Sequence, residues 1–131
     1  CKSAGIENIS LDVMLGVQEQ TQKSLSETLD FCIASGAKHI SAYMLKIEEG
    51  TTYYKKRDSL NLPDDDEVAD MYLAMSERLL SNGFEHYEIS NFARQGYEGK
   101  HNLKYWNCEE YLGLGPSAHS FIDGKVSKGY N

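Results

Sequence analysis

The chain has 131 residues, of which 40% are hydrophobic and 25% charged, and its formal net charge is −7. The acidic balance argues against a nucleic-acid backbone as the main partner. No apolar run approaches the roughly 18 residues that a membrane helix needs. The length and composition suit one globular domain, and because the N-terminus carries no export signal, we expect a cytoplasmic protein.

The three cysteines, Cys1, Cys32 and Cys108, are odd in number and widely spaced. This pattern favours reduced thiols over a disulfide framework. The first residue is cysteine and not methionine, and the sequence reaches Asn131 without a closing element. We therefore expect an interior fragment of a longer protein; a processed whole domain is the alternative.

A first strand is predicted over residues 6–15, ended by Gly16, and a helix over 22–35 follows the N-cap Thr21. Asp12 lies inside the apolar strand, where a carboxylate is costly unless it is paired or bound. A structural partner and a bound ligand are both consistent with this position. The apolar stripe of the helix includes Cys32, which we expect to be a core thiol.

The later elements are predicted from the same kinds of signal. In the third strand we expect His86 and Glu88 to share one face, and we expect His39 to be a surface or capping residue. The predicted order is a strand over 39–45, a loop over 46–52, a charged linker to Pro63, a helix capped by the acidic run 64–67 and ended by Asn82 and Gly83, a strand over 84–90, a long loop through 107, and turn and strand within 112–122.

Alternating strands and helices at this spacing predict an α/β fold with parallel strands and right-handed crossovers. Polar residues gather where the predicted strands end, at 12–16, 43–48 and 88–91. The carboxyl ends of parallel strands are where α/β folds build their sites. The sequence therefore predicts a binding site at this end of the sheet.

Two histidines stand in an unusual aromatic and glycine-rich setting near the C-terminus. His101 precedes Tyr105 and Trp106, and His119 follows the Gly113–Pro116 turn. The histidines are eighteen residues apart, which is not a zinc spacing. The residues themselves leave two alternatives open: the block packs a loop onto the domain, or it lines a ligand pocket.

Several stretches together resemble the oxygen-independent coproporphyrinogen III oxidase-like family of radical S-adenosylmethionine proteins, and most of all its heme-chaperone branch. They cover nearly the whole chain, in order. The stretches are Leu11–Gly16 with Gln20 and Thr21, Ile40–Leu45 with Glu48, Gly50 and Thr51, Tyr87–Ala93, His101–Trp106, and Gly113–Ser120.

The resemblance implies a fragment of a partial (β/α) TIM-like barrel that holds a 4Fe-4S cluster. The cluster's Cys-x-x-x-Cys-x-x-Cys motif would lie upstream of this chain, which has no such spacing. The chain would then be the C-terminal part of the barrel. Its β/α units would span about 6–91, and a glycine-rich loop and strand region would span 92–131.

The resemblance also implies site residues. Asp12 would contact the nucleoside part of S-adenosylmethionine, Gly16 would border it, and the main chain from Met44 to Lys46 would line the adenine side. His101 would be linked to heme, beside Tyr105 and Trp106. No residue of this chain is expected to be catalytic or to hold a metal ion of the cluster.

Two departures from the family pattern matter. Val17-Gln18-Glu19 replaces the usual Leu-Pro-Gly, which we expect to loosen the turn after Gly16. Gly99 stands where a cysteine often precedes His101 by two residues, so a second soft heme ligand is in doubt.

The family resemblance predicts a parent protein that binds a cluster, S-adenosylmethionine and a heme or porphyrinogen, while this chain alone is inert. One alternative is a non-enzymatic heme-binding module. Another is an unrelated α/β hydrolase-type domain that uses His101, His119 and a carboxylate. Exposed sheet edges would favour self-association of the fragment.

Overall fold

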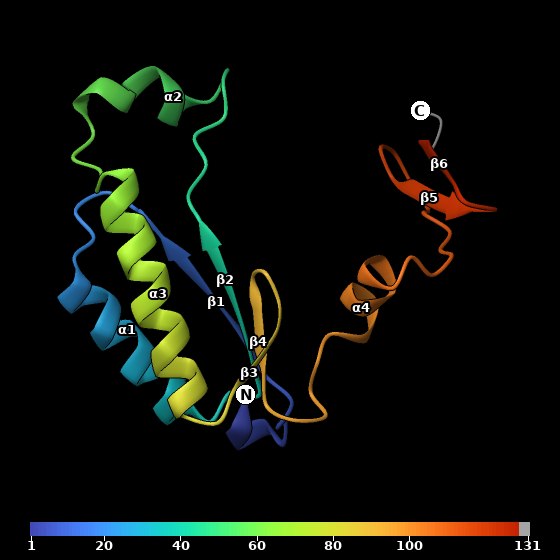
Figure 1. Cartoon of the computed structure of the whole chain (residues 1–131), viewed down its shortest axis with the longest axis horizontal. Helices are drawn as coiled ribbons and strands as arrows, with labels where there is room; N and C mark the ends of the chain where they lie inside the picture. Colours follow the sequence, from blue (N-terminus) through green and yellow to red (C-terminus); the bar gives the residue numbers. More distant parts are fainter. Residues whose placement is uncertain (129–131) are drawn as a thin grey trace. The chain divides into compact units, whose positions relative to one another are not determined.

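The computed structural model describes residues 1–128 and divides the chain into two compact units, Cys1–Glu98 and Gly99–Asn131. Among the described residues, no helix has the length and apolar character needed to cross a membrane. The elements, labelled in Figure 1, are η1 (Lys2–Ala4), β1 (Ser10–Leu15), α1 (Gln22–Ser35), β2 (His39–Met44), α2 (Thr52–Lys56), η2 (Arg57–Ser59), α3 (Asp65–Ser81), β3 (Glu85–Glu88), β4 (Asn91–Ala93), α4 (Lys100–Trp106), β5 (His119–Ile122) and β6 (Lys125–Lys128).

The first unit contains a mixed sheet with the strand order β1-β2-β4-β3. β1 and β2 are parallel, as predicted, but β4 is antiparallel to both β2 and β3. The prediction of an all-parallel arrangement is therefore wrong beyond the first two strands. The reason is local: only Ile89 and Ser90 connect β3 to β4, and so short a connection reverses the chain direction.

Helices α1 and α3 lie side by side along one side of β1 and β2 (Figure 1). These helices bury every second side chain of the two strands. The opposite face of the sheet carries no helix from this unit. The buried cluster between helices and sheet consists of Val13, Leu15, Leu25, Leu29, Cys32, Ile40, Ala42, Met71, Met75, Leu79, Phe84 and Phe92.

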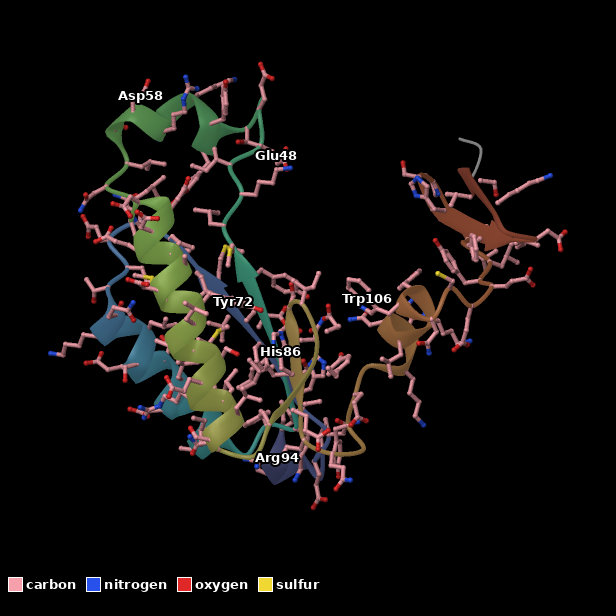
Figure 2. The ribbon with its side chains drawn as sticks, viewed as in Figure 1. Glu48, Asp58, Tyr72, His86, Arg94 and Trp106 are labelled. Atoms are coloured by element: carbon pink, nitrogen blue, oxygen red, sulfur yellow. The ribbon has the colours of Figure 1, made fainter. Side chains whose placement is uncertain are left out.

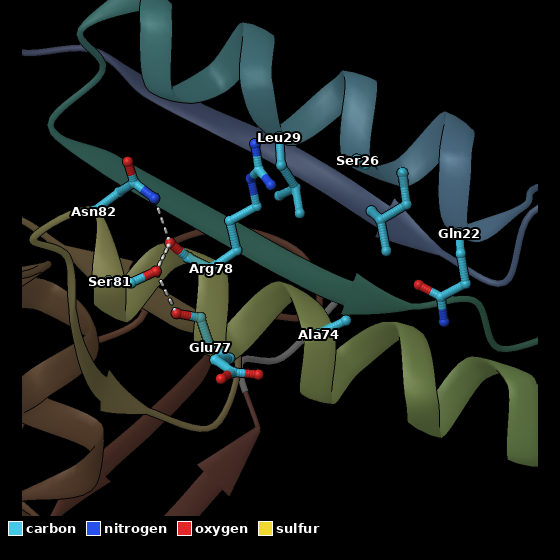
Figure 3. A pocket seen from close by; sticks show the side chains of 9 residues that line it. Gln22, Ser26, Leu29, Ala74, Glu77, Arg78, Ser81 and Asn82 are labelled. Carbon is cyan, nitrogen blue, oxygen red and sulfur yellow. Dashed lines mark hydrogen bonds between the residues drawn. The ribbon is translucent and has the colours of Figure 1, made fainter.

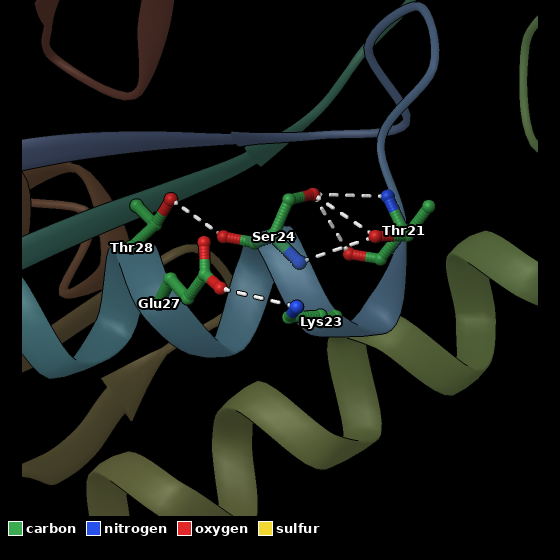
Figure 4. Close-up of polar contacts among 5 residues, drawn as sticks. All are labelled: Thr21, Lys23, Ser24, Glu27 and Thr28. Atoms are coloured by element: carbon green, nitrogen blue, oxygen red, sulfur yellow. Dashed lines mark hydrogen bonds and ion pairs between the residues drawn. The ribbon is translucent and has the colours of Figure 1, made fainter.

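Both long helices begin at a capping box, at Thr21 and Asp64. This confirms the N-cap predicted at Thr21 and the cap predicted from the acidic run 64–67. Thr21 Oγ1 accepts the backbone N–H of Ser24 at 3.1 Å, and the Ser24 hydroxyl accepts the N–H of Thr21 at 3.0 Å (Figure 4). The Asp64 carboxylate accepts the N–H of Glu67 at 2.8 Å. These bonds satisfy donors that a helix N-terminus otherwise leaves unpaired.

We expect Thr21→Ala to lower the free energy of unfolding by about 1 kcal/mol, because it removes the acceptor for the Ser24 N–H. Urea denaturation of the chain measures the change. Thr28→Ala is the matched control, since the Thr28 hydroxyl only donates to the Ser24 carbonyl inside the helix at 2.9 Å. That variant should stay within about 0.5 kcal/mol of the original chain. Equal losses for the two variants would contradict the capping assignment.

The loop predicted from residue 91 through residue 107 is wrong. Its first residues form β4, whose Phe92 is fully buried, and its last residues form α4. A three-residue strand is too short to show a period. α4 is only seven residues long and has no side-chain cap at Gly99. Neither β4 nor α4 therefore has the local sequence signals from which strands and helices are predicted.

The second unit contains α4 and the antiparallel hairpin β5-β6. Asp123 and Gly124 connect the strands, and both have positive φ angles, 52° and 71°. Two such residues are the requirement of a type I′ hairpin turn. β5 confirms the strand predicted within 112–122, and Tyr111 extends the hairpin through a bridge to Phe121.

Candidate functional site

A row of polar side chains crosses the face of the sheet that α1 and α3 leave free. Asp12 of β1 pairs in register with Ser41 of β2, Ser41 pairs with Asn91 of β4, and Asn91 pairs with Glu88 of β3. Register partners in neighbouring strands share a face, about 4.8 Å apart. Asp12 is exposed, whereas Ser41 and Asn91 are buried. We call these four residues the polar row.

The end of the polar row is fixed by hydrogen bonds within the β3-β4 turn. The side-chain amide of Asn91 donates to Glu88 Oε1, and Glu88 Oε2 accepts the backbone N–H of Ser90 at 3.2 Å. Asn91 is only 4% exposed. Because its nitrogen donates to Glu88, the buried amide of Asn91 has a fixed orientation.

His39 lies beside the polar row, held at both ring nitrogens. Ser10 Oγ is 2.9 Å from Nδ1, and the Tyr87 hydroxyl is 2.8 Å from Nε2. The prediction of a surface or capping histidine is therefore wrong, since the side chain is half-buried and joins three strands. Tyr87 can reach it because the register of β3 shifts between His86 and Glu88.

The same register shift separates His86 from Glu88. His86 stacks on the buried Phe92 with ring centroids 4.2 Å apart, and its Nε2 lies 3.2 Å from the Tyr72 hydroxyl of α3 (Figure 2). Glu88 instead bonds Asn91 in the polar row. The prediction that the two residues share a face is wrong, because a bulge breaks the period of two on which it was based.

Burial lowers the pKa of His39 from its ordinary 6.5, and the nearby carboxylates of Asp12 and Glu88 oppose that shift. The folded chain therefore takes up a proton on His39 less readily than the unfolded chain does. The stability that follows is fully present above the unfolded pKa and is lost as the pH falls through the folded pKa.

We expect the free energy of unfolding to fall between about pH 7 and pH 5 more steeply in the original chain than in His39→Gln. Urea denaturation across that range gives both curves, and their difference isolates His39 from the other titrating groups. His119→Gln, at an exposed histidine, should follow the original curve. If His39→Gln also follows it, His39 does not titrate as described.

Gly16 and Met44 come together at the carboxyl ends of β1 and β2. They line a pocket of about 390 Å³ with residues from the start of α3, including Val68. Gly16 has a φ of +78°, and a Cβ there would lie 3.0 Å from Val68 Cγ2, so its backbone packs tightly against α3. Met44 is 50% exposed. The pocket is thus placed where the sequence predicts a site.

The turn after Gly16 is tied by one side chain in place of the missing proline and glycine. Gln20 Oε1 accepts the N–H of Gly16 at 2.7 Å, and Gln20 Nε2 donates to the Met14 carbonyl at 3.0 Å. Glu19 adopts φ 58°, a left-handed conformation that glycine takes without strain.

Lys46, beyond β2, is exposed and pairs with Glu48 at 2.9 Å, which raises the pKa of Lys46.

The predicted heme-linked residues lie on α4 in the second unit. His101 and Tyr105 are one helical turn apart, with His101 Nε2 2.8 Å from the Tyr105 hydroxyl. Tyr105 also meets Tyr111 edge to face, with ring centroids 4.6 Å apart. Trp106 is 53% exposed. The result is an exposed imidazole beside the aromatic ring of Tyr105, and one nitrogen of the imidazole is already hydrogen-bonded.

The cysteines do not form a metal centre. Cys32 is a buried core thiol, as predicted, and burial raises the pKa of its thiol. Within residues 1–128, no three histidine, cysteine or acidic side chains gather closely enough to hold a metal ion. Any iron–sulfur cluster would need ligands from other residues.

A groove of about 450 Å³ runs between α1 and α3 (Figure 3). Leu25 and Leu29 form its apolar part, and Arg78 at its edge pairs with Asp30. It contains none of the predicted site residues. The polar row, which carries exposed and buried hydrogen-bonding groups without a helix above it, is the stronger candidate site.

No protein-family model matches the chain. Curated proteins do: the chain is 41% identical to the heme chaperone HemW of Bacillus subtilis over 125 residues, covering 94% of this chain. It is 43% identical to HemW of Synechocystis over 122 residues, or 92% of this chain. Over these residues the chain is similar to heme chaperones, which confirms the resemblance to the coproporphyrinogen III oxidase-like radical S-adenosylmethionine family.

Other relatives extend the comparison. Radical S-adenosyl methionine domain-containing protein 1 of mouse mitochondria is 39% identical over 113 residues, or 85% of this chain. The chain spans 26% to 33% of the length of these three relatives. The solved structure of coproporphyrinogen III oxidase (HemN) from Escherichia coli, described as a radical SAM enzyme, covers 94% of this chain with a TM-score of 0.69. It is 18% identical, and the match spans 31% of its own chain, so it supports the fold.

Proposed function

We propose that these residues are part of a longer radical S-adenosylmethionine heme chaperone, in which they form one segment of a partial (β/α) barrel. The observation that carries the proposal is the exposed Asp12 in the polar row of a chain that is 41% identical to a heme chaperone. The parallel pair β1-β2, with helices on one side, fits a barrel segment whose other face is the interior.

Asp12 fits the nucleoside part of S-adenosylmethionine. No lysine or arginine whose side chain the structure describes forms an ion pair with it, so its carboxylate is available to accept bonds from ribose hydroxyls. Gly16 and Met44 would border the adenine from the strand ends, and Lys46 would follow through its main chain. When bound beside a cluster, S-adenosylmethionine supplies radical chemistry; this chain's residues would bind and orient it.

His101 fits heme as the molecule that the chaperone carries. A neutral imidazole next to aromatic side chains is a common axial ligand. Because Nε2 is hydrogen-bonded to the Tyr105 hydroxyl, Nδ1 is the nitrogen left to bind iron. Trp106 offers an exposed ring for contact with a porphyrin. A heme-binding module without radical chemistry would use the same residues.

The cluster cysteines would lie outside these residues, so we expect the chain alone to be inert in S-adenosylmethionine cleavage. The hydrolase alternative gains no support, because His101 bonds a tyrosine hydroxyl and not a serine or cysteine nucleophile. Self-association through the edge strands β1 and β3 stays a prediction, to be checked by light scattering.

The test is anaerobic calorimetry with S-adenosylmethionine on the complete protein, meaning the full reading frame that contains these residues, after cluster reconstitution. We expect one site, and a loss of affinity of about tenfold or more in Asp12→Asn, which converts two acceptors into one. Asp58→Asn, at an exposed carboxylate of η2, is the control and should bind normally. No binding by the original protein, or equal binding by Asp12→Asn, would overturn the proposal.

A further inference from the structure

The side-chain oxygen of Asn91 has no hydrogen-bond partner among the described residues, although it is buried. Leaving a buried acceptor unpaired is energetically costly, so such groups usually have a partner. Among the side chains that the structure describes, Asn91 Oδ1 is the only buried polar atom left without a partner. A bound molecule that supplies the missing donor would remove this energetic cost.

A rotated amide does not remove the problem. Exchanging the oxygen and nitrogen of Asn91 would place its oxygen against Glu88 Oε1, so two acceptors would face each other. Glu88 is itself held by the Ser90 N–H. The turn therefore keeps the Asn91 nitrogen on Glu88 and leaves the oxygen without a partner.

The position of Asn91 in the polar row indicates what could supply the donor. Asp12 and Asn91 flank Ser41 in register, so their strands are two spacings apart, about 10 Å. Glu88 also forms no ion pair with a lysine or arginine of the described residues, so the row has two carboxylates without a cation. A cationic molecule of nucleoside size, with N–H or O–H donors at separated positions, matches this row.

We propose that Asn91 is a second ligand-binding residue of the candidate site, and that Glu88 is its positioning residue. The Asn91 oxygen accepts a hydrogen bond from an N–H or O–H group of the molecule that binds Asp12. This inference rests on the proposed function, because S-adenosylmethionine, with its hydroxyl and amino donors and its sulfonium charge, is the ligand of that class.

The experiment compares Asn91→Leu with the original complete protein in two measurements, calorimetric affinity for S-adenosylmethionine and the free energy of unfolding in urea. Leucine has nearly the same shape and no acceptor. We expect affinity to fall about tenfold, the effect of one lost hydrogen bond. Stability should change little, because the substitution removes an unpaired acceptor along with one bond to Glu88. A purely structural role predicts the opposite pattern, a loss of stability with unchanged affinity.

If Asn91→Leu does not fold, the variant Glu88→Ala tests the same proposal. It leaves the Asn91 oxygen in place but frees the amide to rotate, so we expect a smaller loss of affinity, about threefold. Glu85→Ala, at an exposed residue of the same strand, should bind as the original protein does. If Asp12→Asn weakens binding while the folded Asn91 and Glu88 variants bind normally, the oxygen meets a buried water only, and this inference is wrong although the proposed function stands. If the original protein does not bind S-adenosylmethionine, both fail.

Discussion

Replacing Phe92 by alanine should lower the free energy of unfolding of the first unit by about 3–5 kcal/mol, the range for deleting a buried aromatic ring. Phe92 is 0% exposed and pairs in register with the buried Ile40 of β2. Its ring stacks on His86, which contacts Tyr72 of α3. Removing it opens a cavity where β2, β3, β4 and α3 meet, and so large a loss is a major part of a typical domain's stability.

Urea denaturation of the chain measures this loss, and Phe31→Ala is the matched control. Phe31 lies on α1 and is 69% exposed, so the same chemical change there should cost no more than about 0.5 kcal/mol. If the two phenylalanine variants lose equal stability, β4 does not form the buried strand that positions Asn91.

His101→Ala should abolish specific heme binding by the complete protein, or weaken it by about tenfold or more. The imidazole is exposed on α4, and Tyr105 fixes one of its nitrogens at 2.8 Å, so the other is free for the iron. Titration with heme, followed by the absorption change on axial ligation, gives the affinity.

His119→Ala is the control for that titration, since His119 is an exposed histidine in the same unit. It should bind heme as the original protein does. If His119→Ala loses binding and His101→Ala keeps it, the heme assignment on α4 is wrong. Loss in neither variant would indicate that heme binds without a histidine from this unit.

The elements with strong local signals were predictable. α1 and α3 have apolar stripes, capping residues at Thr21 and Asp64, and ends at Gly36 and Asn82. These signals lie within a few residues of one another in the sequence. β4 was not predictable in this way, because its three residues form a strand only through pairing with β2 and β3, and pairing partners are not visible in the sequence.

Some residues of the candidate site could likewise be predicted from the sequence, and others could not. Asp12 could be singled out because a carboxylate in an apolar strand is costly wherever the strand lies. The polar row could not, because its members come from four strands whose register the sequence does not specify. His39 was assigned to the surface for the same reason: its partners Ser10 and Tyr87 are 29 and 48 residues away along the chain. The available signal for Asn91 was its place in the polar stretch 88–91 at the end of a predicted strand.

The most direct measurement is a structure of the complete protein with S-adenosylmethionine bound. The account predicts that the ligand lies over the polar row, with a ribose hydroxyl within hydrogen-bond distance of the Asp12 carboxylate and Gly16 and Met44 at its border. A ligand bound elsewhere, for example in the groove between α1 and α3, with Asp12 left without a contact, would contradict it.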